Sequence, residues 1–131
     1  MPSTIQVKTR NRNEMKDVTS AVQDEVARTG VQNGVCAVYV PHTTAGVTIN
    51  EGADPAVCED ILSKLQELVP PHAGYRHMEG NADSHIKASL MGSSVSVIVE
   101  NGRLVLGTWQ KIFFCEFDGP RTRRAYVTLS S

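Results

Sequence analysis

The sequence lacks the features that mark membrane, secreted and nucleic-acid-binding proteins. No apolar run approaches the roughly 20 residues that a membrane-spanning helix needs. The start, Met1-Pro2-Ser3-Thr4, has no apolar core of a secretory signal. The net charge of -1 gives no general attraction to nucleic acid or to an anionic membrane surface. We therefore expect a cytoplasmic protein that binds neither nucleic acid nor membranes.

Cysteine is scarce and is not arranged for zinc. The three cysteines, Cys36, Cys58 and Cys115, form no C-x-x-C pair, which argues against a zinc site of the finger type. Each lies in an apolar run, so we expect free core thiols, as is usual in a reducing compartment. The H-E-x-x-H motif, the P-loop and the dinucleotide fingerprint are also missing.

The sequence does contain enough apolar residues for one α+β domain over 1–131. The chain has 131 residues, of which 40% are hydrophobic, and this supports a core without disulfides. Hydrophobic periodicity and turn residues predict a strand at 4–8, a helix at 17–28, strands at 34–41 and 45–51, a helix between Asp54-Pro55 and Pro70-Pro71, a short helix at 84–91, and strands at 94–100, 103–106, 109–117 and 123–129. The pattern indicates a mostly antiparallel sheet with two main helices and one short helix.

Individual residues predict how the helices begin and which side they bury. Asp54 suits an N-cap and Pro55 the first helical position. The expected buried stripe of this helix is Val57, Ile61, Leu65 and Leu68. Asp83 is placed to cap the short helix, which Gly92 closes.

The predicted strands carry more apolar surface than the predicted helices can cover. Segment 34–41 is almost wholly apolar, which predicts a strand covered on both faces. In segment 109–117, alternation puts four residues on one face: Trp109, Phe113, Cys115 and Phe117. The four late strands form a broad face that two modest helices can hardly cover, so we expect contact with other subunits.

Polar residues interrupt the apolar pattern in the tract 40–55, which contains His42, Glu51 and Asp54. Such groups are costly to bury unless they are paired or functional. A second polar cluster, 81–87, contains His85. Our first hypothesis is a pocket shared by His42, Glu51 and His85, which could also hold a divalent metal such as Zn²⁺ or Mg²⁺. On local grounds His42 equally suits a hydrogen-bonded core position, Glu51 a first-turn charge and Asp54 a helix cap.

The start of the short helix is a candidate anion site. Free backbone amides at a helix start attract anions, and His85 and Lys87 could bind phosphate or carboxylate there. A plain surface helix start is the alternative. Arg121, Arg123 and Arg124 lie together near the chain end and suit either a local basic site or a solvated strand edge.

The remaining candidates are aromatic and loop residues. Trp109 suits either the core or a stacking wall for a heterocyclic ligand, and Gln110 points to the opposite face of the same strand. His72 and His77 lie in an irregular loop after Pro70-Pro71, where residues are more often exposed than functional. Their roles stay open, although His77 is close in sequence to the second polar cluster.

Three motifs taken together resemble a known family. They are H-T-T-A-G-V-T-I-N-E at 42–51 with Asp54-Pro55, S-H-I-K-A-S-L-M-G at 84–92, and G-T-W-Q at 107–110 with F-D-G-P-R at 117–121. In this order they resemble the YjbQ-like family, known as secondary thiamine-phosphate synthase enzymes. The resemblance covers nearly the whole chain.

The resemblance implies an α+β fold that assembles as a homotrimer, with sheets packed orthogonally around the threefold axis. It also implies a weak thiamine-phosphate synthase activity, which joins hydroxymethylpyrimidine diphosphate to a thiazole phosphate and releases pyrophosphate. The motif positions that would carry the site are His42, Glu51, Asp54, His85, Lys87, Trp109, Gln110 and Arg121.

Three functional hypotheses follow for these residues. The first is an enzyme for a phosphorylated heterocycle, in which Lys87, Arg121 and the helix start at His85 hold phosphate. Trp109 then stacks on the ring, and His42 or Glu51 moves the proton. The second is a metal-dependent hydrolase or lyase that uses two histidines and a carboxylate. The third is a trimeric small-ligand-binding module without turnover.

Overall fold

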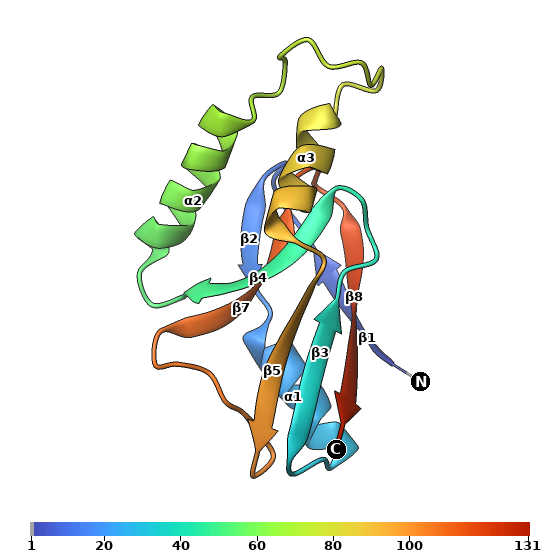
Figure 1. Ribbon diagram of the computed structural model, residues 1–131, viewed down its shortest axis with the longest axis vertical. Coiled ribbons are helices and arrows are strands. Elements are labelled where there is room, and N and C mark those ends of the chain that lie inside the picture. The colour runs from blue at the N-terminus through green and yellow to red at the C-terminus, as the bar shows by residue number, and fades with distance from the viewer. Residues whose placement is uncertain (1) are drawn as a thin grey trace.

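Two antiparallel sheets and three helices make up residues 2–131, the part of the chain that the computed structural model describes (Figure 1). The larger sheet has the strand order β1-β8-β3-β5-β6 and the smaller one β2-β7-β4. The strands are β1 (Ser3–Lys8), β2 (Glu14–Asp17), β3 (Gly34–Tyr39), β4 (Ala45–Glu51), β5 (Ser94–Glu100), β6 (Arg103–Leu104), β7 (Gln110–Glu116) and β8 (Thr122–Ser130). The helices are α1 (Thr19–Thr29), α2 (Pro55–Leu68) and α3 (Ala82–Met91). The predicted α+β class with antiparallel strands is confirmed.

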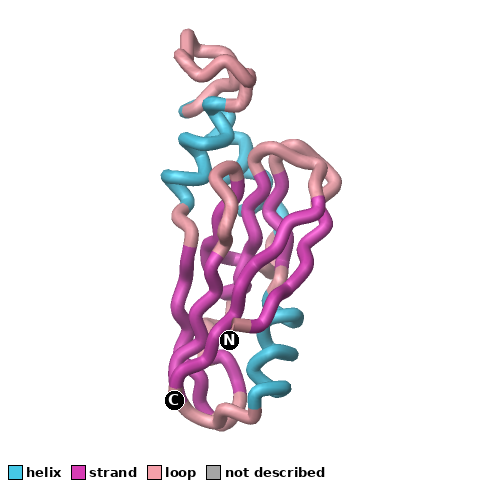
Figure 2. The backbone as a smooth tube through the Cα atoms, turned by 90° about the vertical axis from the view of Figure 1, so that its right-hand side faces the viewer, coloured by secondary structure: helices cyan, strands magenta, loops and turns pink. Residues whose placement is uncertain are grey.

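The main core lies between the two sheets and α1. Val22 and Val26 of α1 are fully buried against inward-facing residues of both sheets, such as Val38 and Phe114. Full burial of each such side chain contributes roughly 1.5–3 kcal/mol. Figure 2 shows α1 along one side of the strands, whereas α2, α3 and the loop between them stand at one end. No helix within residues 2–131 is long and apolar enough to cross a lipid bilayer.

Capping and turn residues in the sequence predicted several helix and strand boundaries correctly. Gly30 ends α1 in the left-handed conformation, with φ of 75°. Asn101 and Gly102 have φ of 53° and 76° and join β5 to β6 in a two-residue hairpin, because this dipeptide favours positive φ at both positions. Asp54 caps α2 by accepting a hydrogen bond from the amide of Ala56.

The prediction for segment 34–41 was wrong in one respect. β3 is flanked by β5 and β8, and only its inward side chains are buried. Val35 is 42% exposed and Tyr39 48% exposed on the outer face of the larger sheet. An apolar run does not distinguish a face covered within the chain from a face covered by another molecule. The short strand β2 was also not predicted, because its sequence has no apolar alternation.

The buried stripe predicted for α2 is observed only in part, because Val57, Ile61 and Leu65 are partly rather than fully buried. Leu68 is 63% exposed, and every residue of α2 keeps some contact with solvent. The side that packs inward carries Cys58, Leu62 and Leu65, which contact a second small cluster around Phe113. The helix is only shallowly buried, because it packs against β2, an edge strand of the smaller sheet.

Two further residues occupy other positions than expected. Asp83 does not cap α3: Asn81 precedes the helix, and Asp83 lies fully buried in its first turn. There the carboxylate of Asp83 pairs with Arg12 at 3.0 Å and with Lys87 at 3.5 Å. Trp109 lies just before β7 and is 63% exposed, so it does not belong to the buried face of that strand.

Candidate functional site

His42 and His85 line one pocket of about 420 Å³ together with Thr43, Ser89 and Ser93. They also line an adjoining pocket of about 350 Å³, whose other wall carries Pro41, Thr44, Glu79, Asn81, Asp118, Arg121 and Arg123. The two pockets share His42, Thr43 and His85, and we call them together the histidine pocket. The predicted proximity of His42 and His85 is therefore observed.

Local packing explains why the two histidines meet. His42 lies in the connection between β3 and β4, and α3 crosses the beginning of β4. A side chain at Gly46 would put its Cβ only 2.5 Å from the carbonyl oxygen of Gly92, so glycine is what lets α3 approach the strand. The hydroxyl of Ser84 also donates to the carbonyl of Phe117 at 2.6 Å, which fixes the first turn of α3 beside the end of β7.

His42 is held as a neutral imidazole. The backbone amide of Arg124 donates to Nε2 of His42 at 3.1 Å, which requires an unprotonated Nε2 and puts the ring proton on Nδ1. Burial lowers the pKa of His42, and the nearby charges of Arg123 and Arg124 lower it further. His42 therefore has an N–H donor at Nδ1 and is poorly suited to accept a proton at Nε2.

The opposite wall of the histidine pocket is built around Asp118. Its Oδ2 atom accepts hydrogen bonds from Arg121 and from the Nδ2 atom of Asn81, each at 2.9 Å. Arg121 remains half exposed and can reach an anion in the pocket. Within residues 2–131 the buried Oδ1 atom of Asn81 has no hydrogen-bond partner. The wall therefore provides both a cation and an unused acceptor.

A buried ion pair supports the floor of this pocket. Arg123 pairs with Glu116, and its guanidinium also donates to the hydroxyl of Thr44 at 2.8 Å. Burial alone would raise the pKa of Glu116, but hydrogen bonds from Arg123 and its neighbours outweigh burial and hold that pKa below its ordinary value. The sequence placed Arg123 in a basic trio but did not identify it as a site residue. Arg123 lies two residues before Ala125 and four before Val127 on β8, so it points to the same face. Both of those residues are buried, which identifies Arg123 as inward-facing.

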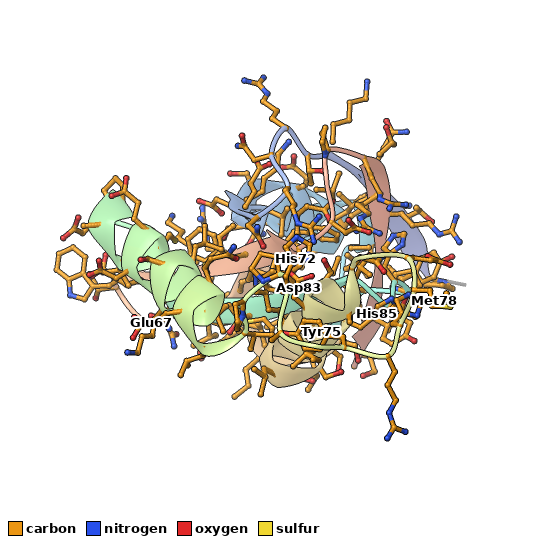
Figure 3. The ribbon with its side chains drawn as sticks, turned by 90° about the horizontal axis from the view of Figure 1, so that it is seen from above. Glu67, His72, Tyr75, Met78, Asp83 and His85 are labelled. Carbon is orange, nitrogen blue, oxygen red and sulfur yellow. The ribbon has the colours of Figure 1, made fainter. Side chains whose placement is uncertain are left out.

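The loop between α2 and α3 adds a third histidine. The ring of His77 meets the ring of His85 edge-on, with centroids 5.2 Å apart, and Nε2 of His77 lies 3.8 Å from Glu79. Figure 3 shows this loop passing over α3, seen from above. His72 lines a separate small pocket under the loop. His77 therefore joins the second polar cluster, and His72 does not.

Glu51 does not share the histidine pocket within one chain. β4 is extended from Ala45 to Glu51, and six steps of about 3.3 Å put its ends about 20 Å apart. Figure 1 shows β4 running from the side of α3 to the start of α2. Glu51 accepts hydrogen bonds at Oε2 from the amides of Ala53 and Asp54, both at 2.8 Å. The expected tight connection between His42 and Glu51 does not form.

Glu51 belongs to a different pocket of about 370 Å³, which we call the acidic pocket. Its lining consists of Asn11, Asn13, Glu14, Met15, Asp17, Glu51, Gly52, Asp54, Pro55, Cys58, Glu59, Leu62 and Phe113. Gln110 pairs with Glu51 across β7 and β4, and the amide of Gly52 donates to the carbonyl of Trp109 at 2.9 Å. Trp109 and Gln110 therefore lie at the Glu51 end, away from His42.

Lys87 is also outside the histidine pocket. It is only 1% exposed, and its Nζ atom donates to Oε1 of Gln66 at 2.6 Å and lies 3.5 Å from Asp83. Burial lowers the pKa of Lys87, while the charge of Asp83 counteracts this effect. Lys87 therefore ties α3 to α2, and a phosphate in the histidine pocket has no access to it.

The residues of one chain do not fit a three-ligand metal site. No group of three or more histidine, cysteine, aspartate or glutamate side chains is placed to hold a metal ion within residues 2–131. The predicted set of His42, His85 and Glu51 is divided between the two ends of β4. We therefore derive no chemical step that uses a metal.

Comparison with known proteins gives a consistent family. A family model described as "UPF0047 protein YjbQ-like" matches residues 3–131. The UPF0047 protein YugU of Bacillus subtilis is 54% identical over 130 residues, which cover 98% of each chain. A UPF0047 protein of Methanocaldococcus jannaschii is 49% identical over 124 residues, covering 95% of this chain and 90% of that relative.

Solved structures agree with the sequence relatives. A YjbQ/UPF0047 family protein of Clostridium acetobutylicum matches with a TM-score of 0.96 and 51% identity, covering 98% of this chain and 99% of that chain. A YbjQ-like protein of unknown function from Sulfolobus solfataricus matches with a TM-score of 0.94 and 36% identity, covering 98% of this chain and 95% of that chain. The family resemblance drawn from the three sequence motifs is thereby confirmed, and the chain belongs to the YjbQ-like UPF0047 family.

Proposed function

We propose that the chain is an enzyme for a small phosphorylated heterocycle and that the reaction takes place in the histidine pocket. The observation that carries this proposal is the pairing of His42 and His85 in one pocket with Arg121 on its wall. His42 donates a hydrogen bond from Nδ1 to a substrate oxygen, and His85 exchanges a proton with the reacting group. Arg121 holds the phosphate, and its charge stabilises negative charge that develops on a leaving group.

The finer proposal is a weak thiamine-phosphate synthase activity. In this reaction a thiazole phosphate and hydroxymethylpyrimidine diphosphate are joined, and pyrophosphate leaves. Membership of the YjbQ-like family supports the proposal, because the family resemblance implied that activity. The half-exposed guanidinium of Arg121 suits a phosphate or pyrophosphate group, whereas the buried Lys87 takes no part. One accessible cation fits a weak activity better than an optimised synthase.

Release of pyrophosphate from the two thiamine precursors tests this proposal directly. We expect His85→Ala to lower kcat/KM by about 100-fold or more, as is typical when a proton-transfer group is lost. His42→Ala should also lower kcat/KM, because it removes a hydrogen-bond donor to the substrate. His72→Ala is the matched control, because His72 lines a different pocket, and it should keep wild-type activity. Unchanged activity in both His42→Ala and His85→Ala would show that the site is assigned to the wrong pocket.

The binding-module alternative is favoured by an unused acceptor in the histidine pocket, the Oδ1 atom of Asn81. It predicts tight binding of a thiamine precursor without turnover. Calorimetry with each precursor, run beside the pyrophosphate assay on the same sample, distinguishes the two functions. The metal-dependent hydrolase or lyase has no such support from a single chain, whose described residues provide no three-ligand group.

We also propose that the chain assembles as a homotrimer with orthogonally packed sheets. The outer face of the larger sheet supports this proposal, since Val35, Tyr39 and Ile98 are all exposed there. A second subunit on this face would bury them. Light scattering tests the assembly, and a monomer mass at working concentration would contradict it. The three free cysteines support a reducing compartment such as the cytoplasm.

A further inference from the structure

We infer that a second copy of the chain completes the site by placing its Glu51, with the acidic pocket around it, against the histidine pocket of the first copy. The inference rests on the proposed function, because it takes the histidine pocket as the place of the reaction. It goes further by assigning a carboxylate, a partner and an interface to that site.

The histidine pocket has no carboxylate of its own that is well placed to work with the imidazoles of His42 and His85. Two acids line it. Asp118 already accepts a hydrogen bond from Arg121 at 2.9 Å, and Glu79 is 76% exposed on the loop. Neighbouring arginine charges lower the pKa of His42, in addition to the effect of burial. Arg121 is half exposed on this wall, so its positive charge can be reached by an acid from outside.

The acidic pocket has the opposite charge. Its charged lining groups within residues 2–131 are all carboxylates: Glu14, Asp17, Glu51, Asp54 and Glu59. The backbone amides of Ala53 and Asp54 both donate to Oε2 of Glu51, so Oε1 is available to a partner. The two pockets lie at opposite ends of β4, about 20 Å apart at roughly 3.3 Å per residue. They cannot meet within one chain, but the half-exposed guanidinium of Arg121 can attract the carboxylates of the acidic pocket when two copies approach each other.

Exposed apolar side chains flank both pockets. Trp109 is 63% exposed, and its carbonyl accepts the amide of Gly52 in the acidic pocket. Ile86 and Leu90 are exposed on α3, within one turn or so of His85. Protein interfaces typically combine apolar anchors of this kind, tryptophan above all, with a charged rim. The same contact that joins the charges therefore also removes apolar surface from water.

A contact between two different patches of identical chains is heterologous, and it forms a closed ring when the rotation closes. A homotrimer is one such ring, in which each copy gives its Glu51 to one neighbour and receives a carboxylate from the other. A carboxylate beside an imidazole favours the charged form of that ring and raises its pKa. Glu51 of the neighbour thus prepares His85 to deliver a proton to the substrate.

The single tryptophan of the chain tests the interface without any substitution. Trp109 is solvent-exposed in one chain and lies at the inferred contact. We expect its fluorescence in the assembled protein to be blue-shifted from that of exposed indole, and to shift to the red when dilution dissociates the assembly. Fluorescence of a fully exposed indole in the assembled protein, with the mass checked by light scattering, would overturn the inferred interface.

Subunit mixing tests the shared site. Glu51→Gln keeps an oxygen that can accept from Ala53 and Asp54, so the turn before α2 should still form. We expect pure Glu51→Gln and pure His85→Ala assemblies both to lose at least about 100-fold of the pyrophosphate-releasing activity. When the two variants are co-expressed with different tags, assemblies that carry both tags contain both variants. These mixed assemblies should recover about one third of the wild-type activity per trimer, because each mixed ring contains one intact pair of His85 and neighbouring Glu51.

The outcomes separate this inference from the proposed function. Absence of recovery in mixed assemblies, or full activity in the pure Glu51→Gln assembly, would overturn the inference and leave the histidine pocket as the site. Full activity in pure His85→Ala would overturn the proposed function, while the fluorescence of Trp109 would still decide the interface. Glu67→Gln is the matched control and should behave as wild type, because Glu67 is an exposed acid on α2 that pairs with Lys64.

Discussion

The backbone amide of Arg124 donates a hydrogen bond to Nε2 of His42 over 3.1 Å, and so connects β8 to the segment between β3 and β4. This contact assigns the ring proton of His42 to Nδ1. It also leaves the Nδ1–H group of His42 as a hydrogen-bond donor.

We expect long-range ¹⁵N–¹H correlation spectra of the histidines to show His42 as the Nδ1–H tautomer at neutral pH. Because its pKa in the folded protein is lowered, the neutral ring contributes stability that is present above the unfolded value of about 6.5 and is lost as pH falls through the folded pKa. His42 should therefore titrate below the ordinary histidine value of about 6.5. An Nε2–H tautomer, or a midpoint above that ordinary value, would contradict the assignment.

Arg121→Ala should weaken substrate binding without unfolding the protein. Arg121 is half exposed and pairs with Asp118 at the surface, so its loss should cost no more than about 1 kcal/mol of unfolding free energy. KM for the phosphorylated substrate should rise clearly more than kcat falls if Arg121 binds the phosphate, as we propose. An unchanged KM would show that the phosphate lies elsewhere.

Unlike Arg121→Ala, Lys87→Ala should lower the stability of the fold and leave substrate binding unchanged. Removing Lys87 leaves the buried carboxylate of Asp83 with one cation fewer, and breaking such a buried pair costs about 3 kcal/mol or more. We expect a large decrease in the urea midpoint, with KM near the wild-type value for the fraction that remains folded. A normal urea midpoint combined with a raised KM would return Lys87 to the phosphate-binding residues.

Glu116→Gln should destabilise the fold by about 3–5 kcal/mol, because it leaves the buried guanidinium of Arg123 without its counter-charge. Since the folded pKa of Glu116 is lowered, its contribution is present above the unfolded value of about 4.3 and is lost as pH falls through the folded pKa. Urea unfolding at several pH values should show that this acid-dependent loss is smaller in the variant. Glu67→Gln, whose side chain is 71% exposed, is the control and should change stability little.

Gly46→Ala should disturb the site through packing alone. The added Cβ would lie 2.5 Å from the carbonyl oxygen of Gly92 and 3.3 Å from Cβ of Met91, so α3 must move away from β4. Overpacking of this kind typically costs about 1–3 kcal/mol. We expect both lower thermal stability and lower kcat, because His85 is carried by α3. A fully stable and fully active variant would show that α3 and β4 are not locked together.

The sequence by itself determined the secondary structure wherever the signal was local. The Asp54-Pro55 start of α2, the end of α1 at Gly30 and the Asn101-Gly102 turn all depend on the backbone preferences of the residues concerned, and all are observed. The three motifs likewise determined the family. The polar residues that stand out from apolar sequence pointed to the correct segments for the histidine pocket.

Only the tertiary structure decided which of these residues meet. His42 and His85 are far apart in sequence, and they share a pocket because α3 packs on β4 at Gly46. Glu51 is closer to His42 in sequence, yet an extended strand separates them. Lys87 shares a helix with His85, but it faces the interior, where Gln66 and Asp83 bind it. Sequence periodicity shows which face of a helix or strand a side chain occupies, whereas long-range packing determines which neighbour it contacts.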